Sequence, residues 1–272
     1  MSQQDNFLSP EIAETIVNVR SRFAEWFALI EKCTHVGLAI AHKMAAKVDG
    51  NQKLLETAIF LRVLQSLQAI VVLAERGMAA DARTLLRSAA ESTICQLKMA
   101  DDSAFDQRLI ENHDHYQQKA AKSLLSDAGA LSQLTPEQQR ALRQTLAEIS
   151  ARYPTKEPRK LNTASDAAAA DAMALYITIF RPTSNDAAHT SIESLGRHFF
   201  EAEDGRHKFR IGPQLDDMDS TLGGAANVYL FALMCAAQSF GLPEHEAEVM
   251  AFHEEFKRIA KLGDRGEGAA EK

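Results

Sequence analysis

Cysteine, glycine and proline are scarce in this sequence. The three cysteines, Cys33, Cys95 and Cys235, lie far apart and form no C-x-x-C pair. They argue against a disulfide framework or a cysteine-rich zinc site and favour a reducing compartment, with the thiols in the core. Only 13 glycines and 7 prolines occur among 272 residues. Together with abundant Ala, Leu, Gln, Glu and Arg, these low counts favour helix over strand.

The sequence also lacks an excess of positive charge and a long apolar segment. Its 30 Lys and Arg against 37 Asp and Glu give a net charge of −7, so the chain as a whole has no basic footprint for nucleic acid or anionic membrane. No basic segment followed by an apolar one opens the sequence. The longest strongly apolar run, residues 225–237, is shorter than the roughly 18 residues of a transmembrane helix. We therefore expect a cytoplasmic protein with no membrane partner.

Apolar residues recur at three- and four-residue steps along most of the chain, which is typical of amphipathic helices. The first stripe predicts one long helix to about Val48, with Ser9 as N-cap and Pro10 at the first helical position. Gly77 is expected to end the second helix. Further helices are expected over residues 52–76, 79–99, 103–127, 136–152, 216–240 and 243–261.

Residues 152–160 hold two prolines and four basic residues against one acid, and they form the clearest basic cluster in the sequence. This composition predicts a solvated loop. Beyond the loop, a helix with Tyr176 on its apolar face should end at Arg181-Pro182, because the residue before a proline disfavours helical backbone. Ser184 should then cap a short helix that runs to about His198.

A small extended element is expected before the last two helices. Asp204-Gly205 lies between alternating residues and is a strong hairpin signal within residues 199–211. The sequence therefore predicts an all-α fold, a multi-helix bundle with one small β-hairpin. Because the basic loop is no longer than an ordinary connection, we expect it to lie inside a single helical domain over residues 1–262, followed by a frayed tail at 263–272.

Familiar catalytic signatures such as a P-loop, G-x-G-x-x-G, H-E-x-x-H or G-x-S-x-G do not occur. Instead, Arg83, Arg87 and Glu91 rise along one expected helix at four-residue steps, beside its apolar stripe. One interpretation is a half-exposed ion pair between Arg87 and Glu91, worth about 0.3 kcal/mol. The other is the flank of a cleft, in which a guanidinium held by a carboxylate binds a phosphate or carboxylate group.

A second polar group consists of Tyr176, Ser184 and His189. In one interpretation Ser184 is an N-cap and His189 is an ordinary residue at the boundary of the core. In the other, His189 transfers a proton near neutral pH, with the Ser184 hydroxyl beside it. The spacing alone does not choose between them.

A third candidate is the pair Arg108 and His113, separated by four residues on another expected helix. It is similar to the Arg and His motif of helical ribonucleases of the HEPN superfamily, in which the Arg stabilises the phosphate and the His assists proton transfer. The residue after that Arg is commonly polar and is Leu109 here. The basic loop over residues 152–160 is a further candidate for phosphate contacts, but four charges without interleaved aromatics favour a linker.

Five of these residues together carry a resemblance to a known family. An Arg-x3-Glu helix followed by a Tyr, a Ser-x4-His turn and a small hairpin resembles a widespread family of bacterial helical proteins of unknown function, over about residues 50–240. The resemblance implies an all-helical fold and a shared polar pocket without a metal or cofactor. The residues on which the family pattern falls are Arg87, Glu91, Tyr176, Ser184 and His189.

Two functions stay open, and so does the question whether the protein is an enzyme. In the first, Glu91 holds Arg87, Arg87 binds an anionic group such as phosphate, and His189 acts as acid or base, oriented by Ser184 and Tyr176. Phosphodiester cleavage in nucleic acid, in defence against phage, is its most testable form. The alternative is a non-catalytic protein whose exposed faces bind a partner protein or a second copy of the chain. An anionic ligand, nucleic acid and a homodimer partner are thus the candidates.

Overall fold

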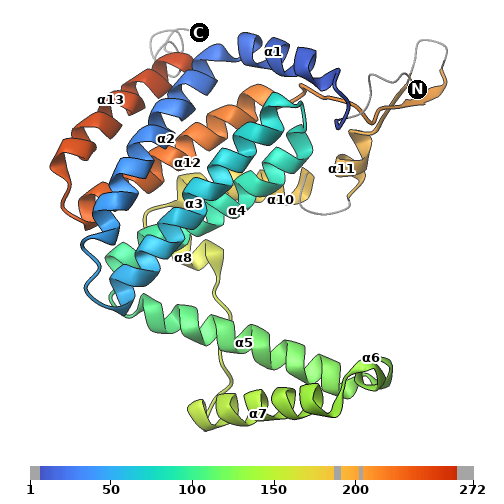
Figure 1. Cartoon of the computed structure of the whole chain (residues 1–272), viewed down its shortest axis with the longest axis vertical. Coiled ribbons are helices and arrows are strands. Elements are labelled where there is room, and N and C mark those ends of the chain that lie inside the picture. Colours follow the sequence, from blue (N-terminus) through green and yellow to red (C-terminus); the bar gives the residue numbers. More distant parts are fainter. Residues whose placement is uncertain (1–6, 187–190, 202–204, 262–272) are drawn as a thin grey trace, which may run out of the picture. The chain divides into compact units, whose positions relative to one another are not determined.

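The computed structural model of the chain describes residues 7–186, 191–201 and 205–261, and it confirms the all-α class (Figure 1). Contacts divide the chain into two compact units, Met1–Asp101 with Thr163–Lys272, and Asp102–Asn162. The single domain expected over residues 1–262 stays a prediction. The elements of the first unit are α1 (Ile12–Arg22), α2 (Ala24–Ala45), α3 (Asn51–Glu75), α4 (Ala79–Asp101), α8 (Thr163–Ala169), α9 (Met173–Leu175), the π-helix η2 (Tyr176–Phe180), α10 (Arg181–Asp186), α11 (Ile192–Gly196), β1 (Phe199–Glu201), β2 (His207–Phe209), α12 (Met218–Ser239) and α13 (Pro243–Ile259).

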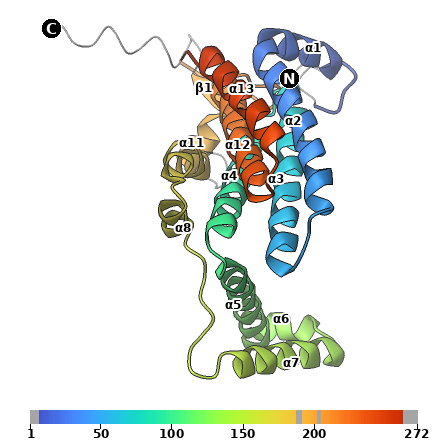
Figure 2. The same ribbon diagram turned by 90° about the vertical axis from the view of Figure 1, so that its left-hand side faces the viewer.

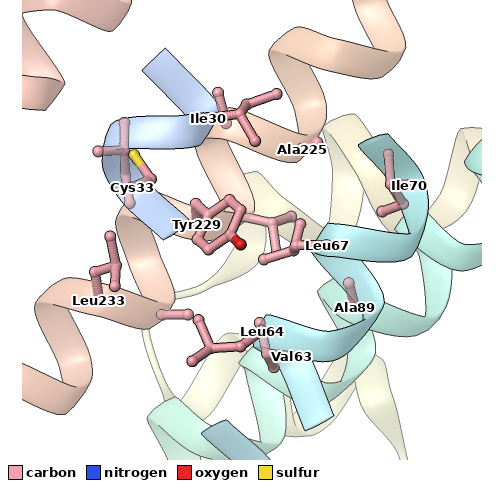
Figure 3. Packing of buried hydrophobic residues seen from close by; sticks show 14 of the residues in the cluster. Ile30, Cys33, Val63, Leu64, Leu67, Ile70, Ala89, Ala225, Tyr229 and Leu233 are labelled. Carbon is pink, nitrogen blue, oxygen red and sulfur yellow. The ribbon is translucent and has the colours of Figure 1, made fainter. Parts of the chain in front are cut away.

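Helix α12 lies at the centre of the first unit's core, because it is apolar on nearly all sides. Helices α2, α3, α4 and α13 all pack against it, and Figure 3 shows Tyr229 of α12 between Cys33 of α2 and Leu67 of α3. The Tyr229 hydroxyl shares a hydrogen bond of 2.8 Å with Thr34 Oγ1, so the buried phenol has a polar partner. Burial raises the pKa of Tyr229 to about 12. Each large side chain buried in this way stabilises the fold by roughly 1.5–3 kcal/mol.

Gly77 ends α3 as predicted. Its φ is 73°, Met78 N–H donates to Leu73 O at 3.0 Å, and Gly77 N–H donates to Ala74 O at 2.9 Å, which is the Schellman arrangement. A Cβ atom at this position would also lie 2.7 Å from Pro213 Cβ. Both the backbone conformation and the available space therefore require glycine, and the resulting turn directs α4 back along α3.

The single long helix expected at the N-terminus is wrong. Turns precede Ile12, where α1 begins, and the Ile12 N–H bonds to Ser9 O, so Ser9 is not the N-cap. Phe23, with φ −114° and ψ 31°, separates α1 from α2. The break lets α1 pack against α3, where Arg20 Nε donates to Glu75 Oε2 at 3.1 Å, while α2 packs against α12. The packing of α1 against α3 and of α2 against α12 thus outweighs the continuous apolar stripe in the sequence.

The helix expected to end at Arg181 and Pro182 continues through both residues, so that prediction is also wrong. Helix α9 widens into the π-helical turn η2, and α10 follows directly. Because proline has no N–H and its ring crowds the preceding turn, a helix that contains it must open locally, and the wide turn just before Pro182 supplies that opening. Ser184 consequently lies inside α10 and is not an N-cap. Helix α11 is capped instead by Ser191, in a capping box with Ser194.

The second unit contains three helices in its described residues. They are α5 (Phe105–Ser126), α6 (Ala128–Gln133) and α7 (Pro136–Arg152). Helices α5 and α7 lie side by side, joined through α6 (Figures 1 and 2). Helix α7 spans the predicted residues because Thr135 forms a capping box with Gln138, with hydrogen bonds of 3.2 and 2.8 Å. The sequence did not indicate α6, which Asp127 caps by accepting from Ala130 N–H at 2.7 Å.

The predicted β-hairpin is confirmed. Strands β1 and β2 pair antiparallel, with Phe199 opposite Phe209, and Gly205 has a φ of 75° in the connection. Every residue of the two strands is exposed to solvent. The described residues of strands β1 and β2 therefore contribute no side chain to the core.

Among the residues that the structure describes, two helices, α3 and α12, are long and apolar enough to cross a membrane by length and composition alone. Core helices of soluble proteins meet the same criterion, and residues of both helices belong to the buried apolar cluster. The criterion is therefore weak support for a membrane span.

Candidate functional site

Helix α4 carries the predicted Arg-x3-Glu motif on a flank that packs against η2, α8 and α10. Arg83 is 9% exposed, whereas the Arg87 and Glu91 side chains are 28% and 42% exposed. Because residues four apart lie on the same side of a helix, the three side chains form a row that passes from the interior towards solvent. Arg87 occupies the middle of this row.

Three contacts fix the guanidinium of Arg87. Its Nε donates to Ser184 Oγ at 2.7 Å, its central carbon lies 4.5 Å from the centre of the Phe180 ring, and Nη1 lies 3.7 Å from Glu91 Oε2. A cation over an aromatic ring contributes about 0.5–2 kcal/mol. The Glu91 contact is too long for a hydrogen bond, and Nη2 has no hydrogen-bond partner in the described part of the chain. The guanidinium is thus oriented while its outer N–H groups stay available.

The π-helical turn positions the groups that hold Arg87. The Ser184 hydroxyl donates its proton to Phe180 O at 2.7 Å, which leaves the oxygen lone pairs to accept from Arg87. Tyr176 stacks on Phe180 with ring centres 5.3 Å apart and an interplanar angle of 20°. Tyr176, Phe180 and the Arg87 guanidinium therefore follow one another in contact, so the wide turn places an aromatic surface and a hydroxyl against the same arginine.

Glu91 is held more loosely than Arg87. Thr163 Oγ1, at the start of α8, donates to Glu91 Oε1 at 3.3 Å, and the rest of the carboxylate is partly exposed. An exposed pair at four-residue spacing contributes only about 0.3–0.5 kcal/mol. Glu91 is therefore placed to influence the charge around Arg87 more than the stability of the fold.

The structure brings together four of the five predicted site residues: Arg87, Glu91, Tyr176 and Ser184. His189 lies outside the described residues. The sequence analysis did not identify Phe180, whose ring contacts both the Arg87 guanidinium and Tyr176. The four-residue spacing from Tyr176 to Phe180 and from Phe180 to Ser184 was the available signal, because it places the three on one side of a continuous helix.

Three of the four basic residues of the loop pair with carboxylates of α5 within the second unit. Arg152 pairs with Asp114, and Lys156 and Arg159 both pair with Glu111, at 3.3 and 3.2 Å. These contacts hold the loop against α5, while the Lys160 ammonium lies 6.0 Å from the centre of the Tyr116 ring. The structure thus favours the linker interpretation over a phosphate-binding loop.

The Arg108 and His113 pair lies on α5. The Arg108 guanidinium lies over the Phe105 ring at 5.3 Å, and His113 is exposed. Five positions along an α-helix correspond to a rotation of about 140°. The two side chains therefore leave the helix on different sides.

The cysteine thiols are poor candidates for chemistry. Burial raises the pKa of Cys33, Cys95 and Cys235 to about 12 each, so they stay protonated near neutral pH and are weak nucleophiles. Among the described residues, no group of three or more His, Cys, Asp or Glu side chains is arranged to hold a metal ion. The arginine cluster is consequently the clearest chemical feature of this part of the chain.

Fold and site together define an all-helical protein with an arginine-centred polar cluster between a long helix and a π-helical turn. The chain belongs to the family of unknown function DUF5677, whose model matches residues 54–207. The expected membership of a family of unknown function is thereby confirmed, and all five predicted site residues lie within the matched range. Comparison with curated proteins and with solved structures gave no match.

Proposed function

We propose that the chain binds a phosphate-containing ligand through Arg87. The observation that carries this proposal is the oriented guanidinium, fixed at one edge by Ser184 and across its face by Phe180, with Nη2 unpartnered among the described residues. Planar guanidinium donors match two phosphate oxygens at once. Since the side chain is already held in place, little rotamer entropy opposes binding.

The catalytic form of this proposal is cleavage of a phosphodiester in nucleic acid, acting in defence against phage. In it, Arg87 stabilises the phosphate charge, and His189, five residues after Ser184 in the sequence, gives or takes the proton. Ser184 positions Arg87, and Tyr176 supports it through Phe180. Glu91 tempers the positive charge.

Binding is tested with fluorescently labelled single-stranded RNA and DNA oligonucleotides, with inorganic phosphate as competitor. Arg87→Gln should weaken binding by about tenfold or more, because a charge-assisted bidentate contact is lost. Arg76→Gln is the matched control, since Arg76 has a similar side-chain exposure of 33% and also pairs with a glutamate. Equal affinities of the two variants would refute the proposal.

Two further variants separate binding from folding and from cleavage. Arg87→Lys keeps the charge but loses the planar fork, so it should bind more weakly than wild type with a melting temperature within about 2 °C. His189→Ala should keep the oligonucleotide affinity and lose product formation on a gel. Product formed at the same rate by His189→Ala would refute the cleavage form alone.

A second candidate function, association with another copy of the chain, is supported by the hairpin and α11. Six large apolar side chains gather there in exposed positions, with exposures of 42–85%, and an isolated two-stranded hairpin is marginally stable in water. Light scattering on wild type and Phe209→Ser tests this association, with Met250→Ser on α13 as an exposed control. A monomeric wild type would remove this candidate. The six residues are Ile192, Leu195, Phe199, Phe200, Phe209 and Ile211.

A further inference from the structure

Arg181 is a second arginine close to the Arg87 cluster. It is the first residue of α10, three positions before Ser184, and it is exposed. Residues three apart on a helix have Cβ atoms about 5–6 Å apart, and Ser184 Oγ lies 2.7 Å from Arg87 Nε. The Arg181 side chain therefore begins close enough to the Arg87 guanidinium for one ligand to reach both.

Burial along the same helix shows on which side Arg181 lies. Thr183 is 2% exposed, whereas Phe180 and Ser184 contact Arg87. With about 100° of rotation per residue, position 181 lies about 60° from position 184, on the side away from position 183. Arg181 is thus at the solvent edge of the Arg87 cluster.

Arg181 has no carboxylate partner among the described residues. Its side chain makes neither an ion pair nor a hydrogen bond in this part of the chain, in contrast to Arg152 and Arg159 of the basic loop. The Arg87 guanidinium also keeps outer donors, because its contact with Glu91 is 3.7 Å long. Two neighbouring guanidinium groups with available donors suit two anionic groups a short distance apart.

Tyr176 presents a third group to a ligand. Its hydroxyl is accessible to solvent and makes no hydrogen bond with a described residue, and its ring stacks on the Phe180 ring that lies beside Arg87. The next residue, Ile177, is 54% exposed. Arginines bind phosphates, and hydroxyls and aromatic rings bind sugars and bases, in proteins that hold a nucleic acid strand.

The charge of the chain favours a short, single-stranded ligand. Its 30 Lys and Arg against 37 Asp and Glu give a net charge of −7, so the chain as a whole does not attract a polyanion. Duplex DNA carries one negative charge per about 1.7 Å of its axis, twice the density of one strand. A site with two arginines therefore suits a single strand better than a duplex.

We propose that the Arg87 site binds a single strand of nucleic acid at two consecutive phosphates. Arg87 binds one phosphate, Arg181 binds the next, and Tyr176 contacts a sugar or base of the same strand. This inference rests on the phosphate binding proposed for Arg87, and it adds the class of ligand and a second binding residue. Free diphosphates carry the same two anionic groups, and competition distinguishes them from a strand.

The salt dependence of binding tests the two phosphate contacts. The affinity of the full chain for a labelled single-stranded oligonucleotide, measured by fluorescence anisotropy, should fall with a slope of log K against log salt of about −1.4, because each contact contributes about −0.7. Arg181→Gln should weaken binding about fivefold and reduce the slope to about −0.7. Arg181→Lys should keep the wild-type slope, because the charge remains.

Arg62→Gln is the matched control for Arg181→Gln. Arg62 of α3 is also exposed and has no ion pair among the described residues, so its replacement should change neither the affinity nor the slope. A wild-type slope in Arg181→Gln, or equal changes in the Arg181 and Arg62 variants, would overturn the second phosphate contact.

Competition identifies the class of ligand. An unlabelled single strand should compete at least about tenfold better than a duplex of the same sequence and than inorganic pyrophosphate. Equal competition by the duplex would overturn the single strand as the ligand, and equal competition by pyrophosphate would show that two phosphates suffice without a strand.

Tyr176→Phe removes only the hydroxyl and should weaken binding of the strand about threefold. Tyr116→Phe is its control, because Tyr116 is 49% exposed and belongs to the second unit. Equal affinities of the two variants would contradict the contact assigned to Tyr176.

Arg87→Gln separates this inference from the function proposed for Arg87. If Arg87→Gln loses affinity while Arg181→Gln keeps the wild-type affinity and slope, only the binding of two consecutive phosphates is overturned. If Arg87→Gln binds the strand as tightly as wild type, phosphate binding at Arg87 is overturned, and this inference falls with it.

Discussion

The basic loop over residues 152–160 and the Arg87 cluster differ in how much of their positive charge is available to a ligand. The loop has the higher density of basic residues, yet Arg152, Lys156 and Arg159 are all paired with carboxylates of α5. Arg87 is a single cation with one long ion pair and outer donors left over. Local charge density in a sequence therefore says little about available donors, which depend on the carboxylates that the fold packs nearby.

Burial of the carboxylates explains the difference. Glu111 is 7% exposed, and it accepts from the Arg159 backbone N–H, the Arg159 side chain and Lys156. These hydrogen bonds, led by that of the Arg159 side chain, hold the pKa of Glu111 below its ordinary value. Glu91 is far more exposed and makes one hydrogen bond, of 3.3 Å. The loop is thus held firmly against α5, whereas the contact between Arg87 and Glu91 is loose.

Replacement of Glu111 and Glu91, each in its own variant, should test the difference between the loop and the Arg87 cluster most clearly. Glu111→Ala should destabilise the second unit by about 2 kcal/mol, because a backbone N–H and two cations lose their acceptor. Glu91→Ala should cost less than about 0.5 kcal/mol, because its pair is exposed and long. Hydrogen exchange of α5 and α7 amides measures the first effect, and that of α4 amides measures the second.

Glu111→Gln is the control for side-chain size, and it should lie between Glu111→Ala and wild type because an amide oxygen still accepts. Equal losses of protection in Glu111→Ala and Glu91→Ala would contradict the proposed difference between a basic loop held firmly by Glu111 and an Arg87 cluster held only loosely by Glu91.

Acid should weaken the loop more than it weakens the Arg87 cluster. Because the pKa of Glu111 is lower in the folded state than its ordinary value of 4.5, its contribution to stability is complete above pH 4.5 and is lost as the pH falls below that value. Protection of α5 amides, corrected for intrinsic exchange, should therefore fall as the pH decreases below about 4.5. The same titration of Glu111→Gln should be flatter. Parallel curves for the two proteins would contradict the assignment to Glu111.

Local signals in the sequence were sufficient for many of the helices and for the hairpin. The predicted range 136–152 matches α7, whose start is fixed within one turn by Thr135, Pro136 and Gln138. Gly77 was predicted as a helix stop, and its positive φ is a property of that single residue. The break at Phe23 was not predictable in this way. It depends on α1 packing against α3, which is far along the chain.

The sequence predicted which residues belong to the site but not how their side chains contact one another. Arg87 and Ser184 are 97 positions apart in the sequence, and no periodicity reports such a contact. Proline at 182 indicated a helix end, and that rule failed because the wide turn at η2 accommodates the ring. The same misplaced boundary made Ser184 look like an N-cap, which hid its role as the acceptor for Arg87.

The smallest expected effect comes from the loss of a single hydroxyl group, that of Ser184. Ser184→Ala leaves the Arg87 charge in place but removes the 2.7 Å bond to its Nε, so the guanidinium keeps only the Phe180 ring and the long Glu91 contact and should be less well oriented. Oligonucleotide affinity should fall about fivefold, which corresponds to about 1 kcal/mol. Ser92→Ala is the matched control, because Ser92 also bonds the carbonyl four residues back, at Ser88. Ser184→Thr should restore affinity, and equal affinities for Ser184→Ala and Ser92→Ala would show that orientation of the guanidinium contributes nothing.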